Sequence, residues 1–286
     1  MKAKASEKKP EDVEAKKEIA EEDVSNVKIE AEKEVVSAVP IEVEELIKAM
    51  PVKREVEGWV PKTETGKKVK NGEIKDIEEI LDMGITIMEP EIIDMLMPEL
   101  SSELLLVGQS KGKFGGGQRR VFKQTQKKTK EGNKPKFSTI AVIGNKNGIV
   151  GMGFGKAKET VPAREKAFRN SKLNVIKIRR GCGSWQCGCK NPHSIPFEVE
   201  GKEGSVIMIL KPAPKGKGLC IQSECKKILE MAGIKDVWSK TRGNTASRSN
   251  LLMACFNALK KLMEVKTGPD HKESLGIAEG MIKNEQ

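Results

Sequence analysis

The chain has 286 residues, enough for one large or two modest domains with cores of their own. It contains no apolar run of roughly 18 residues, which argues against a membrane-spanning helix, and its Lys/Glu-rich start argues against a secretory signal. The net charge of +11 conceals a split: residues 1–110 carry 16 basic and 27 acidic side chains, whereas residues 111–286 carry 36 and 14. Such a basic excess resists compaction unless a polyanion offsets it, so the composition predicts a nucleic-acid partner.

The N-terminal part is predicted to have little core of its own. Residues 1–38 are rich in Lys and Glu and poor in aromatics, which predicts a disordered charged tail. Residues 39–118 are expected to form an extension that packs beside something else. Within it, IKDIEEILDMG and EPEIIDMLMPEL are amphipathic, with Ile77, Ile80 and Leu81 at helical spacing.

A β-hairpin is predicted where FSTIAVIG and IVGMGFG flank the turn signal NKNG at residues 145–148. In the returning strand Val150, Met152 and Phe154 alternate with glycines, so one face should be apolar and the other bare backbone. A glycine face weakens a strand unless another backbone approaches it closely. The upstream stretch RVFKQTQKKTK is the expected third strand.

A helix should follow, with Thr160 as its N-cap and with Ala163, Ala167 and Ser171 forming a seam of small residues. Further strands are expected at LNVIKI, IPFEVEG, GSVIMILKPAP and KDVWSK, and further helices at SECKKILEMAG and at about residues 245–263. Strands and helices mix without regular alternation, which favours an α+β fold. The remaining cysteines, Cys220, Cys225 and Cys255, fit buried positions near helices.

The basic stretches predict a nucleic-acid surface. Between residues 119 and 136, eight cations accompany a single acidic residue, Glu131. KPAPKGKG is a rigid cationic bend, and KTRGNTASRSN puts cations around an expected helix start, where free amides favour phosphate. Base stacking is less expected, because only 3% of residues are aromatic. The candidate RNA-binding residues are Arg119, Arg120, Lys123, Lys127, Lys128, Lys130, Lys134, Lys136, Lys156, Lys158, Arg164, Arg179, Arg180, Lys215, Lys217, Arg242 and Asn244.

The stretch RRGCGSWQCGCKNPH, residues 179–193, holds three of the six cysteines and one of the two histidines. Without a secretion signal, clustered cysteines are better explained as thiols or metal ligands than as disulfides. Cys182, Cys187, Cys189 and His193 suffice for a closed structural zinc site. The C-x4-C-x-C spacing is not the usual pair of C-x2-C knuckles, so a packed, metal-free turn is the alternative. Four ligands leave no open position and no general base accompanies them, so no enzyme is predicted.

The stretch AVIGNKNGIVGMGFGKAKETVPAREKAFRNSKLNVIKIRRG closely resembles small-subunit ribosomal protein family five, in the universal numbering. KPAPKGKGL and ILEMAGIKDVWSKTRGNT extend the resemblance, which covers roughly residues 57–263. The Cys/His segment resembles the archaeal members, and WVPKTETGKKVKNGEIKDIEEI resembles the extension that archaeal and eukaryotic members share. The Gly-rich stretch GKFGGGQRR departs from the family pattern.

The resemblance implies an architecture. It implies a double-stranded-RNA-binding-like domain at 119–178 and a second α+β domain at 195–263 with a left-handed β-α-β crossover. The Cys/His linker would occupy 179–194 between them. Residues 264–286 lie outside the resemblance, and their polar composition predicts a tail. The basic hairpin loop of the family would fall on Lys127–Lys134.

The resemblance also implies a function, that of a structural constituent of the small ribosomal subunit in the cytoplasm. It would bind small-subunit rRNA near the decoding region and near the point where mRNA enters, contact ribosomal proteins four and eight, and support assembly and translational accuracy. Two rival hypotheses are a zinc-dependent RNA-modifying enzyme that uses the Cys/His loop and a regulatory double-stranded-RNA-binding module outside the ribosome.

Overall fold

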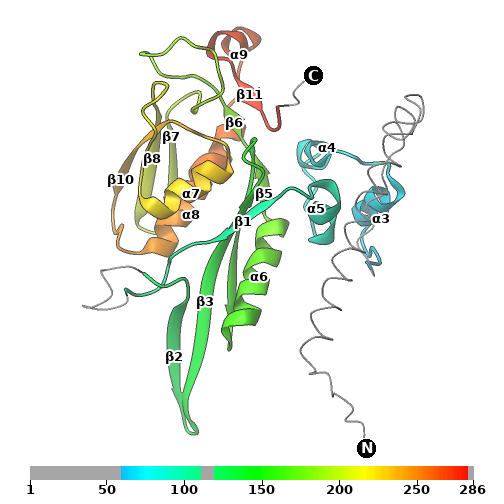
Figure 1. Cartoon of the computed structure of the whole chain (residues 1–286), viewed down its shortest axis with the longest axis vertical. Coiled ribbons are helices and arrows are strands. Elements are labelled where there is room, and N and C mark those ends of the chain that lie inside the picture. Colours follow the sequence, from blue (N-terminus) through cyan, green and yellow to red (C-terminus); the bar gives the residue numbers. More distant parts are fainter. Residues whose placement is uncertain (1–58, 111–118, 283–286) are drawn as a thin grey trace, which may run out of the picture. The chain divides into compact units, whose positions relative to one another are not determined.

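The first sheet is built on a long antiparallel hairpin (Figure 1), in a computed structural model that describes residues 59–110 and 119–282. All described residues belong to one compact unit, which spans 55–286. The predicted charged tail at 1–38 and most of the Gly-rich stretch lie outside the described residues. Within the described ranges, no helix combines the length and the apolar composition that crossing a membrane would require.

Five strands form this sheet. β3 (Gly132–Gly144) pairs with β2 (Lys123–Thr129) along one part and with β1 (Ser101–Leu104) along another. β4 (Ile149–Ala157) is antiparallel to β3, and β5 (Val175–Lys177) pairs with β4. The predicted hairpin and its third strand are therefore confirmed.

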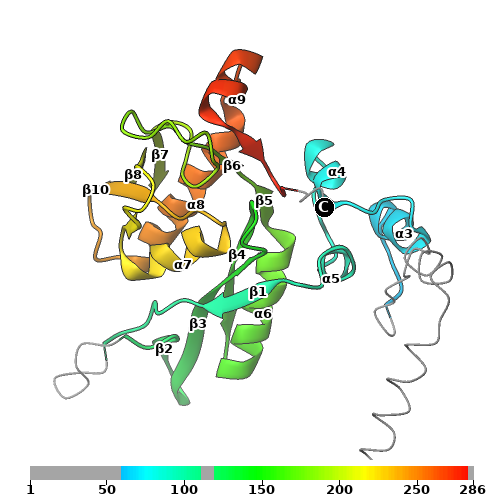
Figure 2. The same cartoon turned by 45° about the horizontal axis from the view of Figure 1, so that its top comes forward.

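α6 (Thr160–Leu173) lies directly on the glycine face of β4 (Figure 2). The seam of small residues that the sequence predicted is the buried side of this helix. A methyl carbon at Gly153 would come within 2.1 Å of the backbone nitrogen of Ser171, so helix and strand touch through their backbones. The prediction of Thr160 as N-cap was wrong, because the helix begins at Thr160 and Glu159 occupies the cap without a capping hydrogen bond.

The second domain contains a four-stranded sheet in the order β7-β8-β10-β9. β7 (Val199–Glu203), β8 (Val206–Pro212) and β10 (Val237–Arg242) are antiparallel neighbours, whereas β9 (Leu219–Cys220) is parallel to β10. α7 (Ser223–Met231) connects these two parallel strands. The predicted left-handed β-α-β crossover, like the double-stranded-RNA-binding-like description of the first domain, stays a prediction.

One core joins the two domains. α8 (Arg248–Glu264) packs on β7 and β8 and buries Leu252, Cys255 and Leu259, as the predicted helical stripe requires. Val150 and Met152 of the first sheet belong to the same cluster of buried residues. The two domains therefore hold a fixed relation through apolar contact, in addition to the linker between them.

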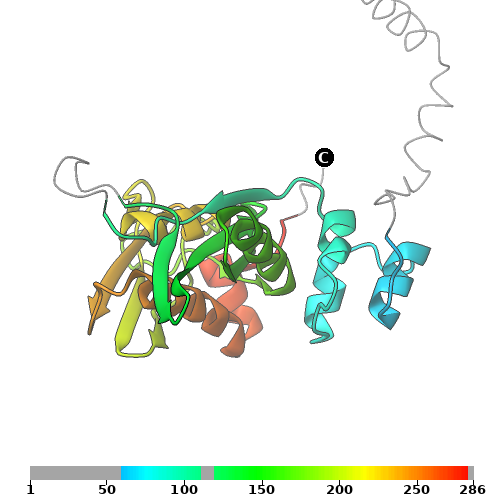
Figure 3. The ribbon, with the colours of Figure 1, turned by 90° about the horizontal axis from the view of Figure 1, so that it is seen from below.

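The described part of the N-terminal extension, residues 59–110, contains three short helices: α3 (Glu64–Asn71), α4 (Ile77–Asp82) and α5 (Glu91–Leu96). They lie on the side of the first domain away from α7 and α8 (Figure 3). Ile77 and Ile92 are buried in a cluster that includes residues of β3, β4 and β5. Since β1 also comes from this extension, the extension completes the first sheet as well as packing on it.

Residues 265–282 contain regular secondary structure, contrary to the prediction of a tail at 264–286. They include α9 (Pro269–Leu275) and β11 (Ala278–Glu279), which pairs with β6 (Arg179–Arg180) of the linker. The Gly280 amide donates to the Ile178 carbonyl at 3.0 Å. Main-chain hydrogen bonds therefore hold this segment, which explains why its polar composition gave no signal.

Candidate nucleic-acid interface and Cys/His cluster

Five exposed lysines share one face of the first sheet at its hairpin end. The register sets Lys127 directly opposite Lys134. It also sets Lys123 opposite Ser138, which in turn lies opposite Lys156 on β4. Side chains that are directly opposite, or two residues apart on one strand, point to the same side of a sheet. We call this surface the lysine face, and its members are Lys123, Lys127, Lys134, Lys136 and Lys156.

The lysine face is electrostatically unfavourable for the protein alone. Like charges directly opposite each other on antiparallel strands are destabilising, and Lys127 and Lys134 form such a pair. Among residues 59–110 and 119–282, no ion pair neutralises a member of the lysine face. A phosphate backbone would supply the missing negative charge.

The lysine face continues the side of the sheet that packs on the second domain. Along β4, Val150 and Met152 are buried, Phe154 is 49% exposed, and Lys156 follows on the same side. α6 covers the opposite side, so it leaves the lysine face open. The sequence grouped Phe154 with the two core residues, but the core ends before this position.

The other predicted cations of the first domain are also at the surface. Lys128 lies on the opposite side of β2, and Lys130 lies in the turn between β2 and β3. Lys158 and Arg164 are exposed at the start of α6, and Arg120 is exposed just before β2. These residues surround the hairpin without sharing one face.

A hollow of about 120 Å³ connects the lysine face to the start of α8. Arg119 and Lys123 line it from one side, and Ser247 and Arg248 line it from the other. The basic surface of the first domain therefore continues onto the second domain.

Arg242 and Asn244 are exposed, as an RNA contact requires, but not at a helix start. Arg242 ends β10, and α8 begins only at Arg248. The intervening turn at Asn244–Ser247 lengthens the loop beyond what the sequence predicted.

Arg179 and Arg180 leave the candidate interface, which corrects the sequence prediction. Arg180 is 4% exposed, and its guanidinium donates to Asn147 Oδ1 at 2.7 Å and to the Gly280 carbonyl at 3.1 Å. Arg179 pairs with Glu279 at 3.1 Å. Both side chains are used to hold the C-terminal segment, because β11 pairs with the linker strand that carries them.

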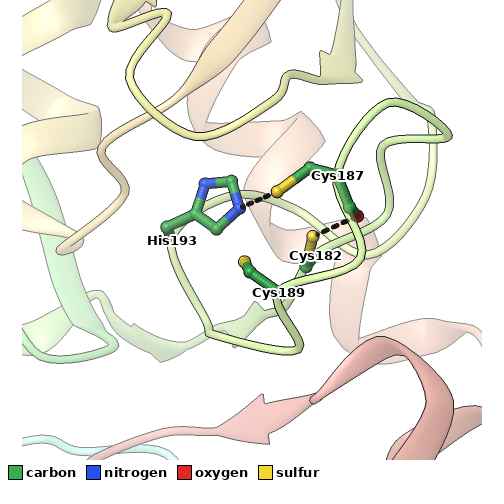
Figure 4. A group of neighbouring side chains, drawn as sticks. All are labelled: Cys182, Cys187, Cys189 and His193. Carbon is green, nitrogen blue, oxygen red and sulfur yellow. Dashed lines mark hydrogen bonds between the residues drawn. The ribbon is translucent and has the colours of Figure 1, made fainter.

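The four predicted metal ligands converge from a single loop (Figure 4). The ligand atoms of Cys182, Cys187, Cys189 and His193 all lie within 4.8 Å of one another. The Cys187 thiol sulfur is 3.8 Å from His193 Nε2. The loop is closed at its base, since the Gly181 and Ser194 backbones exchange two hydrogen bonds.

A buried carboxylate orients the histidine. Asp236 Oδ2 lies 2.8 Å from His193 Nδ1, and both side chains are buried. The other oxygen, Oδ1, accepts a hydrogen bond from the Gly218 amide at 2.7 Å. Asp236 is 43 residues after His193, so no local spacing in the sequence pointed to it.

The cysteine environments differ within the cluster. Burial, with the neighbouring thiols, raises the pKa of the Cys182 thiol to about 11. The backbone amide of Lys215 in the cationic bend, with that of Cys189, lowers the pKa of the Cys187 thiol to about 6. The bend therefore lies against the Cys/His loop, and Lys215 and Lys217 are exposed beside it.

The donor set fits zinc. Zn–S bonds of about 2.3 Å and Zn–N bonds of about 2.0 Å place tetrahedral ligand atoms a little under 4 Å apart. The cluster is already near that spacing, and it offers three sulfurs and one nitrogen. A carboxylate on the far nitrogen of the histidine is the usual second partner of a zinc-bound imidazole, and Asp236 occupies that position. The cluster could therefore hold a metal ion with little rearrangement.

The three remaining cysteines have separate places. Cys225 and Cys255 are buried in the core, as the sequence predicted. Cys220 is exposed, contrary to the prediction, because it ends β9 at the edge of the second sheet.

Comparisons with known proteins match both domains. Residues 119–179 match the family described as Ribosomal protein S5, N-terminal domain, and residues 201–271 match Ribosomal protein S5, C-terminal domain. A protein of Nanoarchaeum equitans named small ribosomal subunit protein uS5 is 48% identical over 229 residues, which are 80% of this chain and 98% of that protein.

Two further archaeal proteins with the same name are similar to the chain. The one from Methanocaldococcus jannaschii is 46% identical over 227 residues, 79% of this chain and 98% of that protein. The one from Staphylothermus marinus is 47% identical over 208 residues, 73% of this chain and 90% of that protein. The similarity thus extends over both domains and beyond them.

Proposed function

The chain belongs to the ribosomal protein S5 family, and on that premise we propose that it binds small-subunit rRNA through the lysine face and its surroundings. Members of this family are structural components of the small ribosomal subunit and not enzymes, and that subunit works in the cytoplasm. This chain would neutralise phosphates and hold RNA segments at a fixed spacing.

The observation that carries the proposal is the paired placement of Lys127 and Lys134 on an open sheet face. Repulsion between these two lysines destabilises the protein when nothing is bound, so their pairing is expected where a ligand offsets the repulsion. When these lysines neutralise phosphates, counterions are released from the RNA, and this release favours binding. The hollow at Arg119 and Arg248 would extend the contact onto the second domain.

The finer parts of the proposal rest on the family resemblance. The chain would lie near the decoding region and near the point where mRNA enters, beside ribosomal proteins four and eight. Two domains joined by one apolar core suit such a place, because a rigid body transmits the position of one RNA segment to another. Assembly and translational accuracy would then depend on the chain without any turnover of its own.

We also propose that the Cys/His cluster holds a structural zinc ion. Cys182, Cys187, Cys189 and His193 would be the ligands, and zinc would supply four bonds that fix the loop. The ligands leave no open position, so the ion would be structural.

Metal analysis of the full chain, purified without added metal, tests the zinc proposal. About one zinc per chain is expected, and Cys187→Ser should lose most of it, whereas Cys220→Ser should keep it. The second substitution is the matched control, because Cys220 is exposed and lies outside the cluster. A wild-type protein that folds without bound metal would show the cluster to be a packed, metal-free turn.

Sedimentation of ribosomal fractions tests the main proposal. The tagged full chain should co-migrate with small subunits at moderate salt, and Lys127→Gln/Lys134→Gln should shift part of it to the free pool. A regulatory module outside the ribosome would not co-migrate. Free wild-type protein at moderate salt, with small subunits intact, would contradict the proposal.

A further inference from the structure

Trp185, in the Cys/His loop, is 88% exposed. The other two tryptophans are partly buried, and the Trp59 ring nitrogen donates to Glu89 at 2.8 Å. A tryptophan that is fully covered buries about 150–250 Å² of surface. An exposed tryptophan therefore contributes little of the hydrophobic free energy that its burial would give. Exposed aromatic side chains of this size are typical of contact sites.

The ring is held by an ordered turn. The Cys187 amide donates to the Ser184 carbonyl at 3.1 Å, which places Trp185 at the first corner of a tight turn. The Gln186 amide donates to Ser184 Oγ at 3.4 Å, and Ser184 itself is buried. Cys182 and Cys187 of the metal cluster lie on either side of Trp185 in sequence, so a partner would meet a pre-organised ring.

The Cys/His loop and the adjoining bend carry basic side chains only, and α9, whose Leu275 carbonyl accepts a hydrogen bond from the Cys182 amide, adds Asp270 and Glu273 next to the loop. The loop at residues 181–193 and the adjoining bend at 213–218 contain three charged side chains, Lys190, Lys215 and Lys217, besides the cluster itself. All three are exposed. The bend is fixed against the loop, because the Gly218 amide donates to Asp236, which in turn holds His193.

We propose that this loop is a second RNA contact, in which Trp185 stacks on an unpaired base while Lys190, Lys215 and Lys217 hold the flanking phosphates. The inference rests on the proposed function and goes beyond it in naming an unpaired nucleotide as the ligand. A flat ring among cations suits single-stranded RNA, because every base offers a π-face and the backbone offers the phosphates. Protein interfaces also bury exposed tryptophans, but the three exposed lysines beside this ring favour a ligand that carries phosphates.

The loop is remote from the lysine face. Figure 1 shows the turn between β2 and β3 and the loop after β6 at opposite ends of the described domains. The two contacts would therefore engage different RNA segments. Double-stranded RNA suits the lysine face, which has open sheet and cations, whereas the stacking ring needs an unpaired base.

Binding of labelled RNA to the full, metal-loaded chain tests the inference. The probes are a single-stranded RNA oligonucleotide without internal pairing and a duplex of the same length. Trp185→Ala should weaken single-strand binding roughly tenfold, Trp185→Phe should retain most of it, and duplex binding should be unchanged. Met88→Ala is the matched control, since Met88 is an exposed apolar side chain in the extension. Zinc content should be the same in all variants.

The outcomes separate this inference from the proposed function. If Trp185→Ala binds the single strand as the wild type does, stacking is refuted, whatever the lysine face does. If Lys127→Gln/Lys134→Gln then still weakens duplex binding, the proposed function survives that failure. Quenching of tryptophan fluorescence by the single strand should occur in the wild type and be largely lost in Trp185→Phe; quenching that persists in the variant would also refute stacking.

Discussion

The guanidinium of Arg180 lies inside the protein, where it donates to the Asn147 side chain and to the Gly280 carbonyl. Both partners are neutral, and burial lowers the pKa of this arginine from its ordinary value. The side chain thereby ties the linker to the turn before β4 and to the C-terminal segment. Two hydrogen bonds offset part of the cost of burying this charge, while its buried Nε has no partner among the described residues.

Arg180→Ala should lower the free energy of unfolding by about 2 kcal/mol, because the buried Gly280 carbonyl and the partly buried Asn147 side chain lose a charged donor. Denaturant unfolding measures this, and RNA affinity at fixed salt should change little while the variant is folded. Lys156→Ala is the control, because Lys156 is exposed on the lysine face. Its stability should stay within about 0.5 kcal/mol of the wild type, while its RNA affinity should fall. If Arg180→Ala leaves stability unchanged but reduces RNA affinity, Arg180 contacts RNA and its structural role is refuted.

Asp236 would act on the proposed zinc site through His193, which it contacts at 2.8 Å, so it is a positioning residue. Asp236→Asn should weaken zinc binding by about 10–100-fold, measured by competition with a chelator. Glu198→Gln is the control, because Glu198 is an exposed acid that lies outside the cluster and pairs with Lys211. Equal zinc affinity in the two variants would show that the imidazole needs no buried carboxylate.

For single residues, the sequence predicted the features that depend on neighbours close along the chain. The four cluster residues lie within twelve positions, so their spacing was readable from the chain alone. Asp236 and the burial of Arg180 depend on contacts with residues far along the chain, and no pattern near either residue signals them.

Among the elements, the pair of β4 and α6 is the most completely specified by its residues. Glycines alternate on one strand face, and small residues recur every fourth position on the helix, so each surface leaves room for the other. The extension was less readable. α3 depends on the Thr63 side chain, which accepts from the Gly66 amide, and on Gly72 with φ of 80° at its end, rather than on an apolar stripe.

Gly153→Ala should destabilise the protein by at least about 1–3 kcal/mol. The added methyl group would clash with the backbone of α6, which cannot shift as easily as a side chain. Thermal unfolding measures the effect. Gly188→Ala is the control, since nothing lies within 4 Å of a methyl group there. Wild-type stability in Gly153→Ala would mean that α6 is not seated on the strand.

The C-terminal segment shows the limit of composition as a guide. Residues 264–286 were predicted as a tail because they are polar, yet β11 pairs with β6 across about 100 residues of sequence. The Asn147 side chain also donates to the Ile282 carbonyl at 3.1 Å. Pairing between main chains leaves little trace in side-chain patterns, so only the folded structure reveals it.

For the whole molecule, charge and shape act together. The basic excess after residue 110 is not spread evenly, since the lysine face gathers five cations on one side of a sheet whose other side is covered by α6. The shared core then fixes this face relative to the second domain and to the Cys/His loop. Family membership could be recognised from the sequence because the hairpin motif is long, whereas the grouping of the lysines required the strand register.

The most direct test of RNA binding through the lysine face is equilibrium binding to small-subunit rRNA over a series of salt concentrations. The wild-type affinity should fall steeply, and Lys127→Gln/Lys134→Gln should reduce the log–log slope by about 1.4–1.8, as expected for two lost phosphate contacts. Lys67→Gln/Lys68→Gln removes the same charge from exposed positions of α3 and should leave the slope unchanged. A flat salt dependence for the wild type, or equal slopes for the lysine-face variant and the wild type, would contradict the account.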